Sequence, residues 1–170
     1  MAFKPVYDYF EAYGLEDRIT QFTRNTQSVG DAADLLGVPL GCIAKSIVFK
    51  LEERLIMVVC SSEERINMRN FKHIFGVEAP LLEDDKVQRL VGHVVGGVCP
   101  FDLPSTIEVY LDMSLRRFPY VYPAAGSRDT AIQLTPAELE IHSQAKGWKY
   151  ICESSDTFGR HPFYLDMFND

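Results

Sequence analysis

IAKSIVFK, residues 43–50, and LIMVVC, residues 55–60, are the two apolar runs that decide the fold. Each run has the length and the β-branched content that are typical of a strand. Glu52-Glu53 lies between them and supplies a short polar turn. The sequence therefore predicts a β-hairpin, with Lys45 as the one cation in the interior of its first strand.

Helices are expected on both sides of this hairpin, because cap and stop residues frame several helical stretches. Ser28, with Asp31 three residues later, begins one that Gly37 ends, and its Ala32-Ala33 and Leu35-Leu36 pairs are expected to be buried. Thr135-Pro136-Ala137-Glu138 is a capping box with proline at the first helical position. The remaining expectations are Pro5–Tyr13 ending at Gly14, Asn67–Phe75, Glu83–Leu90, and an end near Lys146-Gly147 for the last helix.

Further short strands are expected at Ile19–Phe22, Ile107–Leu111, Tyr120–Tyr122, Thr130–Leu134 and Trp148–Cys152. Many short strands with interspersed helices, and no regular βαβ alternation, predict an α+β fold with a mostly antiparallel sheet. The tail, residues 153–170, has no period but carries several aromatic side chains. We expect it to pack on the body of the protein.

Length and composition indicate an ordinary globular protein. At 170 residues, a single domain over residues 1–170 is the expectation. No apolar run is long enough to span a bilayer, and the first residues lack a signal-peptide pattern. These features predict a cytoplasmic protein with no membrane partner.

The net charge is −7, from 17 Lys and Arg against 24 Asp and Glu. An extensive nucleic-acid surface is usually basic, so this balance argues against DNA as a partner. It leaves room for local contact with one RNA end. The cations that could supply such a patch are Lys45, Lys50, Arg69, Lys72, Arg116, Arg117 and Arg128.

Four cysteines and four histidines show neither CxxC nor HExxH spacing, nor any other close ligand pair. The pattern predicts no metal site, no disulfide framework and no cofactor.

A second informative stretch is VGHVVGGVCPFDLP, residues 91–104. Gly96 and Gly97 allow close approach to the main chain, and Pro100 stiffens the loop. Together with Lys45, such a loop suits a site for a carbonyl, carboxylate or phosphate group. The residues alone also permit a plain turn and a lysine on a solvent-facing side of its strand.

Three segments in order resemble the YbaK/EbsC family of free-standing aminoacyl-tRNA deacylases: IAKSIVF, VGGVCP and YPAAGSRDTAIQLTPAEL, the last at residues 122–139. The resemblance spans residues 28–151. It implies a curved mixed sheet with peripheral helices, like the inserted editing domain of prolyl-tRNA synthetase.

The resemblance also implies a function and a site. It suggests a trans-editing, metal-independent deacylase that hydrolyses the ester of a mischarged tRNA of the prolyl type. The partners would be the aminoacyl-tRNA 3′ end and an aminoacyl-tRNA synthetase. The expected catalytic residues are Lys45, Gly96 and Gly97, and the expected substrate-binding residues are Ser46, Val98, Cys99, Pro100, Phe101, Gly126, Ser127 and Arg128.

Several alternatives stay open at this point. The nucleophile is either water or a group of the substrate, such as a thiol or the ribose hydroxyl. Two other functions remain: a non-catalytic module that binds tRNA or a synthetase, and a hydrolase of free amino-acid esters. Gly126, Ser127 and Arg128 also fit an ordinary hairpin tip.

Cys99 stands where the family most often has serine. A nucleophile, a pocket wall and a core residue are its three interpretations. Asp112 and Asp129 are expected to be solvated or turn residues rather than catalytic acids.

Overall fold

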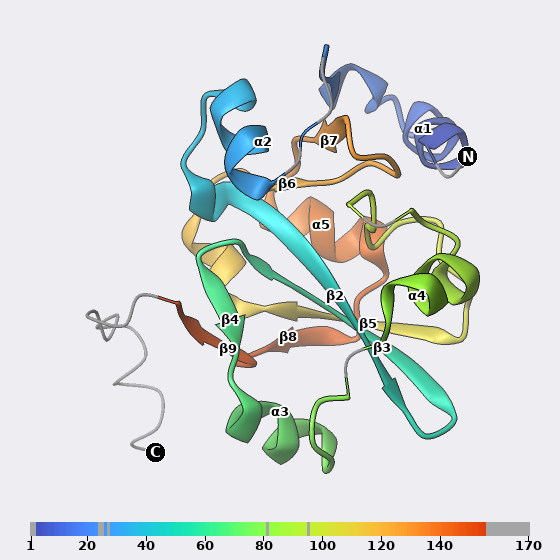
Figure 1. Ribbon diagram of the computed structural model, residues 1–170. Helices are drawn as coiled ribbons and strands as arrows, with labels where there is room; N and C mark the ends of the chain where they lie inside the picture. Colours follow the sequence, from blue (N-terminus) through green and yellow to red (C-terminus); the bar gives the residue numbers. More distant parts are fainter. Residues whose placement is uncertain (1–2, 24–25, 27, 81, 95, 156–170) are drawn as a thin grey trace.

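The computed structural model describes residues 3–23, 26, 28–80, 82–94 and 96–155. At its centre lies a five-stranded sheet of order β6-β2-β3-β5-β8 (Figure 1). Its strands are β2 (Ile43–Leu51), β3 (Arg54–Ser61), β5 (Ile107–Asp112), β6 (Tyr122–Pro123) and β8 (Gly147–Lys149). The predicted hairpin is confirmed, because β2 and β3 pair antiparallel from Ala44↔Ser61 to Leu51↔Arg54.

The α+β class and the curved, mixed sheet are confirmed, but one detail of the pairing differs. Three of the four pairings in the central sheet are parallel: β2 with β6, β3 with β5, and β5 with β8. The expectation of mostly antiparallel pairing is wrong for this sheet. Strand direction follows from long connections, such as the one that carries two helices between β3 and β5, and a strand's own side-chain pattern does not record it.

Two small antiparallel sheets lie beside the central one. They pair β1 (Ile19–Gln21) with β7 (Thr130–Ile132), and β4 (Glu64–Ile66) with β9 (Cys152–Ser154). The strand predicted at Trp148–Cys152 is therefore split between β8 and β9. At the start of β9, the backbone N–H groups of Ile151 and Cys152 donate to Asp112 Oδ1 at 2.8 and 2.9 Å. The expected packing of the tail beyond residue 155 lies outside the described residues.

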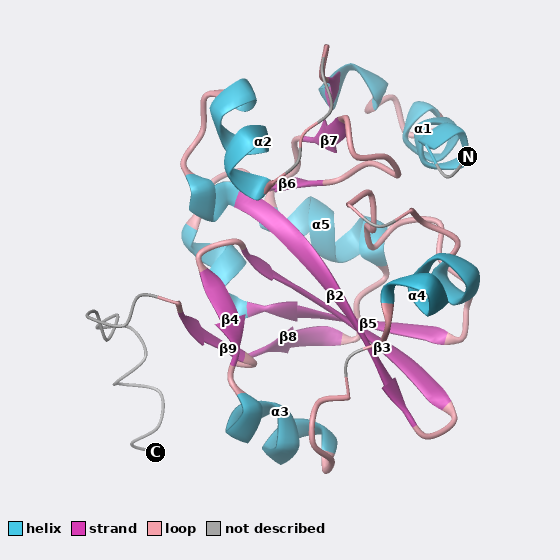
Figure 2. Cartoon of the chain, viewed as in Figure 1, coloured by secondary structure: helices cyan, strands magenta, loops and turns pink. Residues whose placement is uncertain are grey.

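The helices are coloured cyan in Figure 2, and their positions and caps follow the sequence closely. They are α1 (Phe3–Glu11), α2 (Val29–Leu36), α3 (Met68–Phe75), α4 (Asp84–Val91) and α5 (Pro136–Ser143), with 3-10 turns η1 (Glu16–Arg18), η2 (Leu40–Cys42) and η3 (Met113–Arg117). Ser28, Asn67 and Thr135 accept the expected N-cap hydrogen bonds. Two details differ: Leu35 is exposed, and α5 ends at Gln144 in a left-handed conformation rather than at Gly147.

Both faces of the central sheet are buried. On β3, Met57 and Val59 belong to one core cluster, whereas Ile56, Val58 and Cys60 belong to the other. Burial on both sides explains why this strand is a continuous apolar run rather than an alternating one.

Helices from different parts of the chain cover the two faces. Val6 and Phe10 of α1 and Leu139 of α5 pack in the first cluster, and Phe71 of α3 packs in the second. None of the helices within the described ranges has both the length and the apolar character needed to cross a membrane.

Candidate functional site

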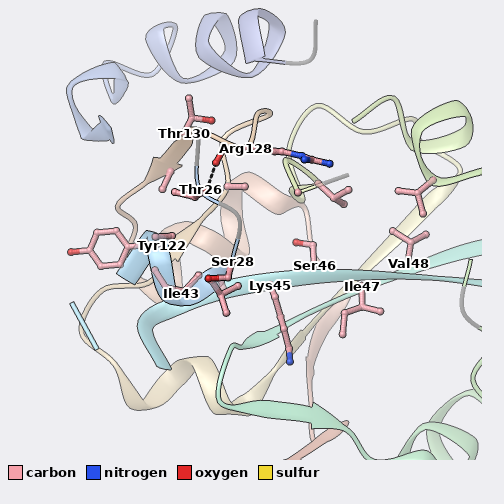
Figure 3. Close-up of a pocket in the computed structure, with 18 of the residues that line it drawn as sticks. Thr26, Ser28, Ile43, Lys45, Ser46, Ile47, Val48, Tyr122, Arg128 and Thr130 are labelled. Carbon is pink, nitrogen blue, oxygen red and sulfur yellow. Dashed lines mark hydrogen bonds between the residues drawn. The ribbon is translucent and has the colours of Figure 1, made fainter. Parts of the chain in front are cut away.

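A cavity of about 460 Å³ opens where three segments far apart in the sequence meet (Figure 3). These segments are β2, the loop after α4, and the turn between β6 and β7. Helix α2 adds a further wall. The lining residues are Phe22, Thr26, Ser28, Val29, Ala32, Ile43, Ala44, Lys45, Ser46, Ile47, Val48, Leu82, Val87, Gly96, Val98, Tyr122, Ala124, Arg128, Thr130 and Ala131.

Strand β2 borders the cavity along its edge. Six consecutive residues, 43–48, line it. Successive side chains of a strand point to opposite faces, so a strand can line a cavity in this way only with its backbone edge. The edge is open because β6 is two residues long and pairs only with Ile43 and Ala44.

Hydrogen bonds further along β2 show which backbone groups reach this edge. The carbonyl of Val48 accepts from Leu82 N–H, and the N–H of Lys50 donates to the Pro80 carbonyl, both on the side away from β3. Within an antiparallel strand the N–H and C=O of one residue point the same way, and alternate residues share that direction. The N–H and C=O of Ser46 therefore point toward the cavity.

The Ser46 side chain adds a third polar group. Its Oγ is buried and has no hydrogen-bond partner in the part of the chain that the structure describes. Figure 3 shows Ser46 and Val48 on the side of β2 that faces Arg128. A buried hydroxyl without a partner is costly, and a bound polar ligand would satisfy it.

Lys45 lies on the opposite side of the strand. Its Nζ donates to the main-chain carbonyl of Glu64, and Figure 3 shows the side chain pointing away from Arg128 and Thr130. The Glu64 carboxylate accepts from Arg117 Nη2 at 2.9 Å. Lys45 thus lines the cavity while its ammonium group is held by a backbone oxygen.

The glycine loop packs tightly on the turn at residues 126–128. A Cβ on Gly97 would lie 2.7 Å from Ser127 Cα, and one on Gly96 would meet the Arg128 side chain at the same distance. The Gly97 N–H donates to the Val94 carbonyl at 2.9 Å. The close approach that requires Gly97 is therefore to the protein's own turn, and its amide is already in use.

Hydrogen bonds within the turn hold it in shape. Ser127 Oγ donates to Asp129 Oδ1 at 2.6 Å and contacts Thr130 Oγ1 at 2.9 Å. The bond from Ser127 lowers the pKa of the Asp129 carboxyl group. Asp129 is thus a turn residue, as expected. Arg128 projects from this turn over the Ser46 side of β2 (Figure 3).

The second half of the glycine loop turns into the core. Cys99 and Phe101 are fully buried, and Phe101 packs edge-on against Phe10 with ring centroids 4.8 Å apart. Burial raises the pKa of the Cys99 thiol to about 12. Of the loop residues expected to bind substrate, Val98 lines the cavity, whereas Cys99, Pro100 and Phe101 do not; Gly126 and Ser127 are also absent from the lining.

His93 is the partner of Cys99. Its Nδ1 accepts from the Cys99 backbone N–H at 3.3 Å and lies 3.7 Å from Sγ. Burial lowers the pKa of His93, so both groups are neutral near pH 7. A neutral thiol beside a neutral imidazole, both below the surface, fits a core contact rather than a nucleophile.

The sequence reasoning missed the apolar walls of the cavity. Val29 and Ala32 come from α2, whereas Leu82 comes from the segment before α4 and Val87 from α4 itself. These residues have no spacing that sets them apart from core positions. Asp112 is a turn residue, one of its two expected alternatives, because it caps η3 through the Ser114 N–H. It is not solvated: it is fully buried and also accepts the backbone N–H groups of Ile151 and Cys152.

Within the described ranges, no three His, Cys, Asp or Glu side chains are arranged to hold a metal ion. The polar groups at the cavity are instead a backbone edge, two cationic side chains and several side-chain hydroxyls, those of Thr26, Ser28, Ser46, Tyr122 and Thr130. Such a set can bind an ester or another carbonyl compound through hydrogen bonds and charge.

Comparison with known proteins identifies the family of this chain. The family model described as an aminoacyl-tRNA editing domain matches residues 23–141. The chain belongs to that family. It is 40% identical over 154 residues to the uncharacterized protein YwhH of Bacillus subtilis (strain 168), covering 90% of this chain and 98% of YwhH.

This editing-domain chain also resembles part of a larger enzyme. It is 32% identical over 91 residues to proline–tRNA ligase of Staphylococcus aureus (strain Newman), covering 53% of this chain but only 16% of the ligase.

Two solved structures share the fold. One is described as a candidate trans-editing enzyme for prolyl tRNA synthetase, with a TM-score of 0.81, 25% identity and coverage of 90% and 98% of the two chains. The other is the hypothetical protein APE2540, with a TM-score of 0.78, 29% identity and coverage of 87% and 99%.

Proposed function

We propose that the protein is a trans-acting aminoacyl-tRNA deacylase that hydrolyses the ester between a wrong amino acid and a tRNA of the prolyl type. The observation that carries the proposal is the open edge of β2 at Ser46, which faces a cavity closed by Arg128 and the glycine loop. Family membership and the likeness to proline–tRNA ligase support the choice of substrate.

The chemistry required of the protein is modest, because the ester of an aminoacyl-tRNA is already activated. The Ser46 N–H supports the carbonyl oxygen as negative charge develops on it, in the manner of an oxyanion hole. Ser46 Oγ and C=O are placed to orient the amino group or the ribose hydroxyls. The nucleophile is water or a group of the substrate itself.

In this scheme Ser46, rather than Gly97, provides the main-chain donor. The Gly97 N–H is bonded to Val94, and the loop's part is to shape the cavity. Lys45 keeps an electrostatic role. Its ammonium group sits on a flexible four-carbon stem, and it leaves the Glu64 carbonyl to meet an anionic or carbonyl oxygen of the substrate.

Selection among amino acids follows from volume at the apolar walls. Val48, Leu82, Val87 and Val98 leave room for a side chain of limited size. One methylene changes the free energy by which such a pocket discriminates between two substrates by only about 1–3 kcal/mol. A second selection step after the synthetase, which hydrolyses wrong products, is therefore useful. Alanine, cysteine, serine and threonine are the amino acids to test.

The experiment is a deacylation time course with prolyl-type tRNA charged separately with these four amino acids. The same amino acids as free methyl esters serve as the comparison. We expect the protein to accelerate loss of at least one aminoacyl-tRNA well above spontaneous hydrolysis, with little effect on the free esters. Hydrolysis of the free esters alone would identify a small-ester hydrolase, and no hydrolysis of either would identify a binding module.

Two variants then test the assigned groups. Lys45→Met keeps the apolar stem and removes the charge, and we expect a large loss of kcat with an intact fold. Ser46→Ala removes only the unpartnered Oγ, and we expect a smaller loss, of about tenfold for one hydrogen bond worth roughly 1.4 kcal/mol. Near wild-type rates in both variants would contradict the site.

A further inference from the structure

We propose that the protein carries a second RNA-binding surface, separate from the cavity, that contacts phosphates of the tRNA acceptor arm. It runs along β8, the edge strand of the central sheet: Arg116 of η3 contacts Trp148, and Lys146 and Lys149 flank Trp148 in the sequence. We call it the η3–β8 surface. This inference rests on the proposed tRNA substrate and extends it, because the cavity accounts only for the 3′ end.

The cations of the η3–β8 surface are not neutralised. Arg116, Lys146 and Lys149 are exposed and make no ion pair with any described residue. Eight other Lys and Arg side chains do make ion pairs. Neither MSLRRF, residues 113–118, nor QAKGWKYI, residues 144–151, contains an acidic residue. In a chain of net charge −7, such a surface concentrates positive potential.

The surface is also rigidly built. The Arg116 guanidinium lies over the Trp148 ring, 5.2 Å from its centroid, which holds the charge in place. Trp148 itself is half-buried against the main core, and it belongs to β8, the edge strand of the central sheet. A cation fixed on an aromatic ring loses less conformational entropy on binding a phosphate than a free side chain does.

A continuous path of contacts joins this surface to the cavity. Arg117, next to Arg116, lies 5.6 Å from the Phe118 ring centroid. That ring packs on Gly41, where a Cβ would come within 2.6 Å of it, and Gly41 is two residues before Ile43 of the cavity wall.

The separation is short enough for one tRNA to reach both places. Tyr122, which also lines the cavity, is five residues after Arg117. Five extended residues span at most roughly 18 Å. In Figure 1, η3 lies just below the start of β2, in agreement with these contacts. A tRNA whose single-stranded 3′ end enters the cavity would bring its acceptor arm close to the η3–β8 surface.

Charge complementarity selects RNA as the occupant. One cation fixed on an aromatic ring, with two further exposed cations close to that ring in the sequence, suits a phosphate backbone, and contacts of this kind give affinity without reading sequence. The alternative is that the η3–β8 surface binds an acidic protein. In that case the affinity for tRNA would not depend on these side chains.

The test compares two double variants that each remove two exposed, unpaired cations. Lys146→Ala/Lys149→Ala alters the η3–β8 surface, and Lys50→Ala/Arg69→Ala is the matched control on β2 and α3. For each protein we would measure the affinity for uncharged prolyl-type tRNA over a salt series, and KM and kcat for aminoacyl-tRNA. We expect the first variant to lower the slope of log affinity against log salt by about 1.4–1.8, the value for two phosphate contacts. Its KM should rise with kcat unchanged, and the control should resemble wild type.

The outcomes separate this inference from the proposed function. Unchanged tRNA affinity in the Lys146/Lys149 variant, with deacylation intact, would overturn the surface and leave the deacylase standing. Equal losses in both double variants would also overturn it, because only the total charge would then matter. If the wild-type protein bound tRNA through this surface but hydrolysed no ester, the proposal of the surface would stand and the proposed deacylase function would be refuted.

Discussion

At the residue scale, Cys99 shows how burial decides the role of a reactive side chain. Next to a glycine loop in the sequence it resembles a nucleophile, but its thiol is fully buried and its pKa is raised to about 12. The neutral thiol is a poor nucleophile, and the lowered pKa of His93 leaves no imidazolium to activate it.

We therefore expect Cys99→Ala to keep kcat within about twofold of wild type while lowering stability by roughly 1 kcal/mol, the cost of a small core cavity. Steady-state deacylation and urea unfolding would measure the two effects. A trapped acyl adduct on Cys99, together with loss of activity in the variant, would contradict this assignment.

Gly97 is the residue at which the loop and the turn meet. In Gly97→Ala the new methyl group would lie 2.7 Å from the backbone of Ser127, so one of the two segments must move. We expect the free energy of unfolding to fall by about 1–3 kcal/mol, as for overpacked core sites, and activity to fall as well because the cavity wall shifts.

Gly147→Ala is the matched control, since a Cβ there meets nothing within 4 Å. Urea denaturation of both variants gives the comparison. If Gly97→Ala kept full stability and lost only activity, the glycine would serve substrate approach rather than packing.

At the scale of one element, the open edge of β2 makes a sharp prediction about proline. Proline removes an N–H and is tolerated in a strand only where that N–H faces away from the ladder. The N–H of Ser46 faces the cavity, whereas the N–H of Ile47 faces β3. Ser46→Pro should therefore fold but lose nearly all activity.

Ile47→Pro is the counterpart on the same strand. We expect it to be less stable than Ser46→Pro by roughly 1–3 kcal/mol, because it leaves a carbonyl of β3 unpaired in the sheet. Circular dichroism, thermal melts and deacylation rates would rank the two variants. The reverse order of stability would mean that the direction of β2 backbone groups is assigned wrongly.

At the scale of the whole molecule, two buried histidines link stability to pH. Burial lowers the pKa of His93 and of His142 from the ordinary value of 6.5. Nearby charges also act on these pKa values. The negative charge of Asp102 raises the pKa of His93. At His142, the negative charge of Glu138 raises the pKa and the positive charge of Arg18 lowers it. The unfolded chain protonates both rings first as the pH falls.

Their contribution to stability is thus complete above pH 6.5 and is lost as the pH falls through the lower folded values. We expect the free energy of unfolding to decrease below pH 6.5 with a slope of at most about 1.4 kcal/mol per pH unit for each proton. Urea unfolding at half-unit steps from pH 7.5 to 5 would measure it. His142→Phe, which keeps an aromatic ring beside Tyr9 and Phe10, should flatten the profile, and an unchanged profile would contradict the role of His142.

The sequence by itself determined the local structure of this protein. The β2–β3 hairpin and the caps at Ser28, Asn67 and Thr135 follow from residues a few positions apart, and the family resemblance follows from three short segments in order. Cap hydrogen bonds, turns and side-chain periods act over that range, so short patterns carry them.

Only the tertiary structure decided the parallel pairings of the central sheet, the open edge at Ser46, and the packing of Gly97 on Ser127. It also decided that Cys99 is core and that Lys45 and Ser46 lie on opposite sides of β2. The physical reason is the same in each case. The outcome depends on how segments tens of residues apart pack together, and a strand's own pattern is identical whichever neighbour, direction or cavity borders its edge.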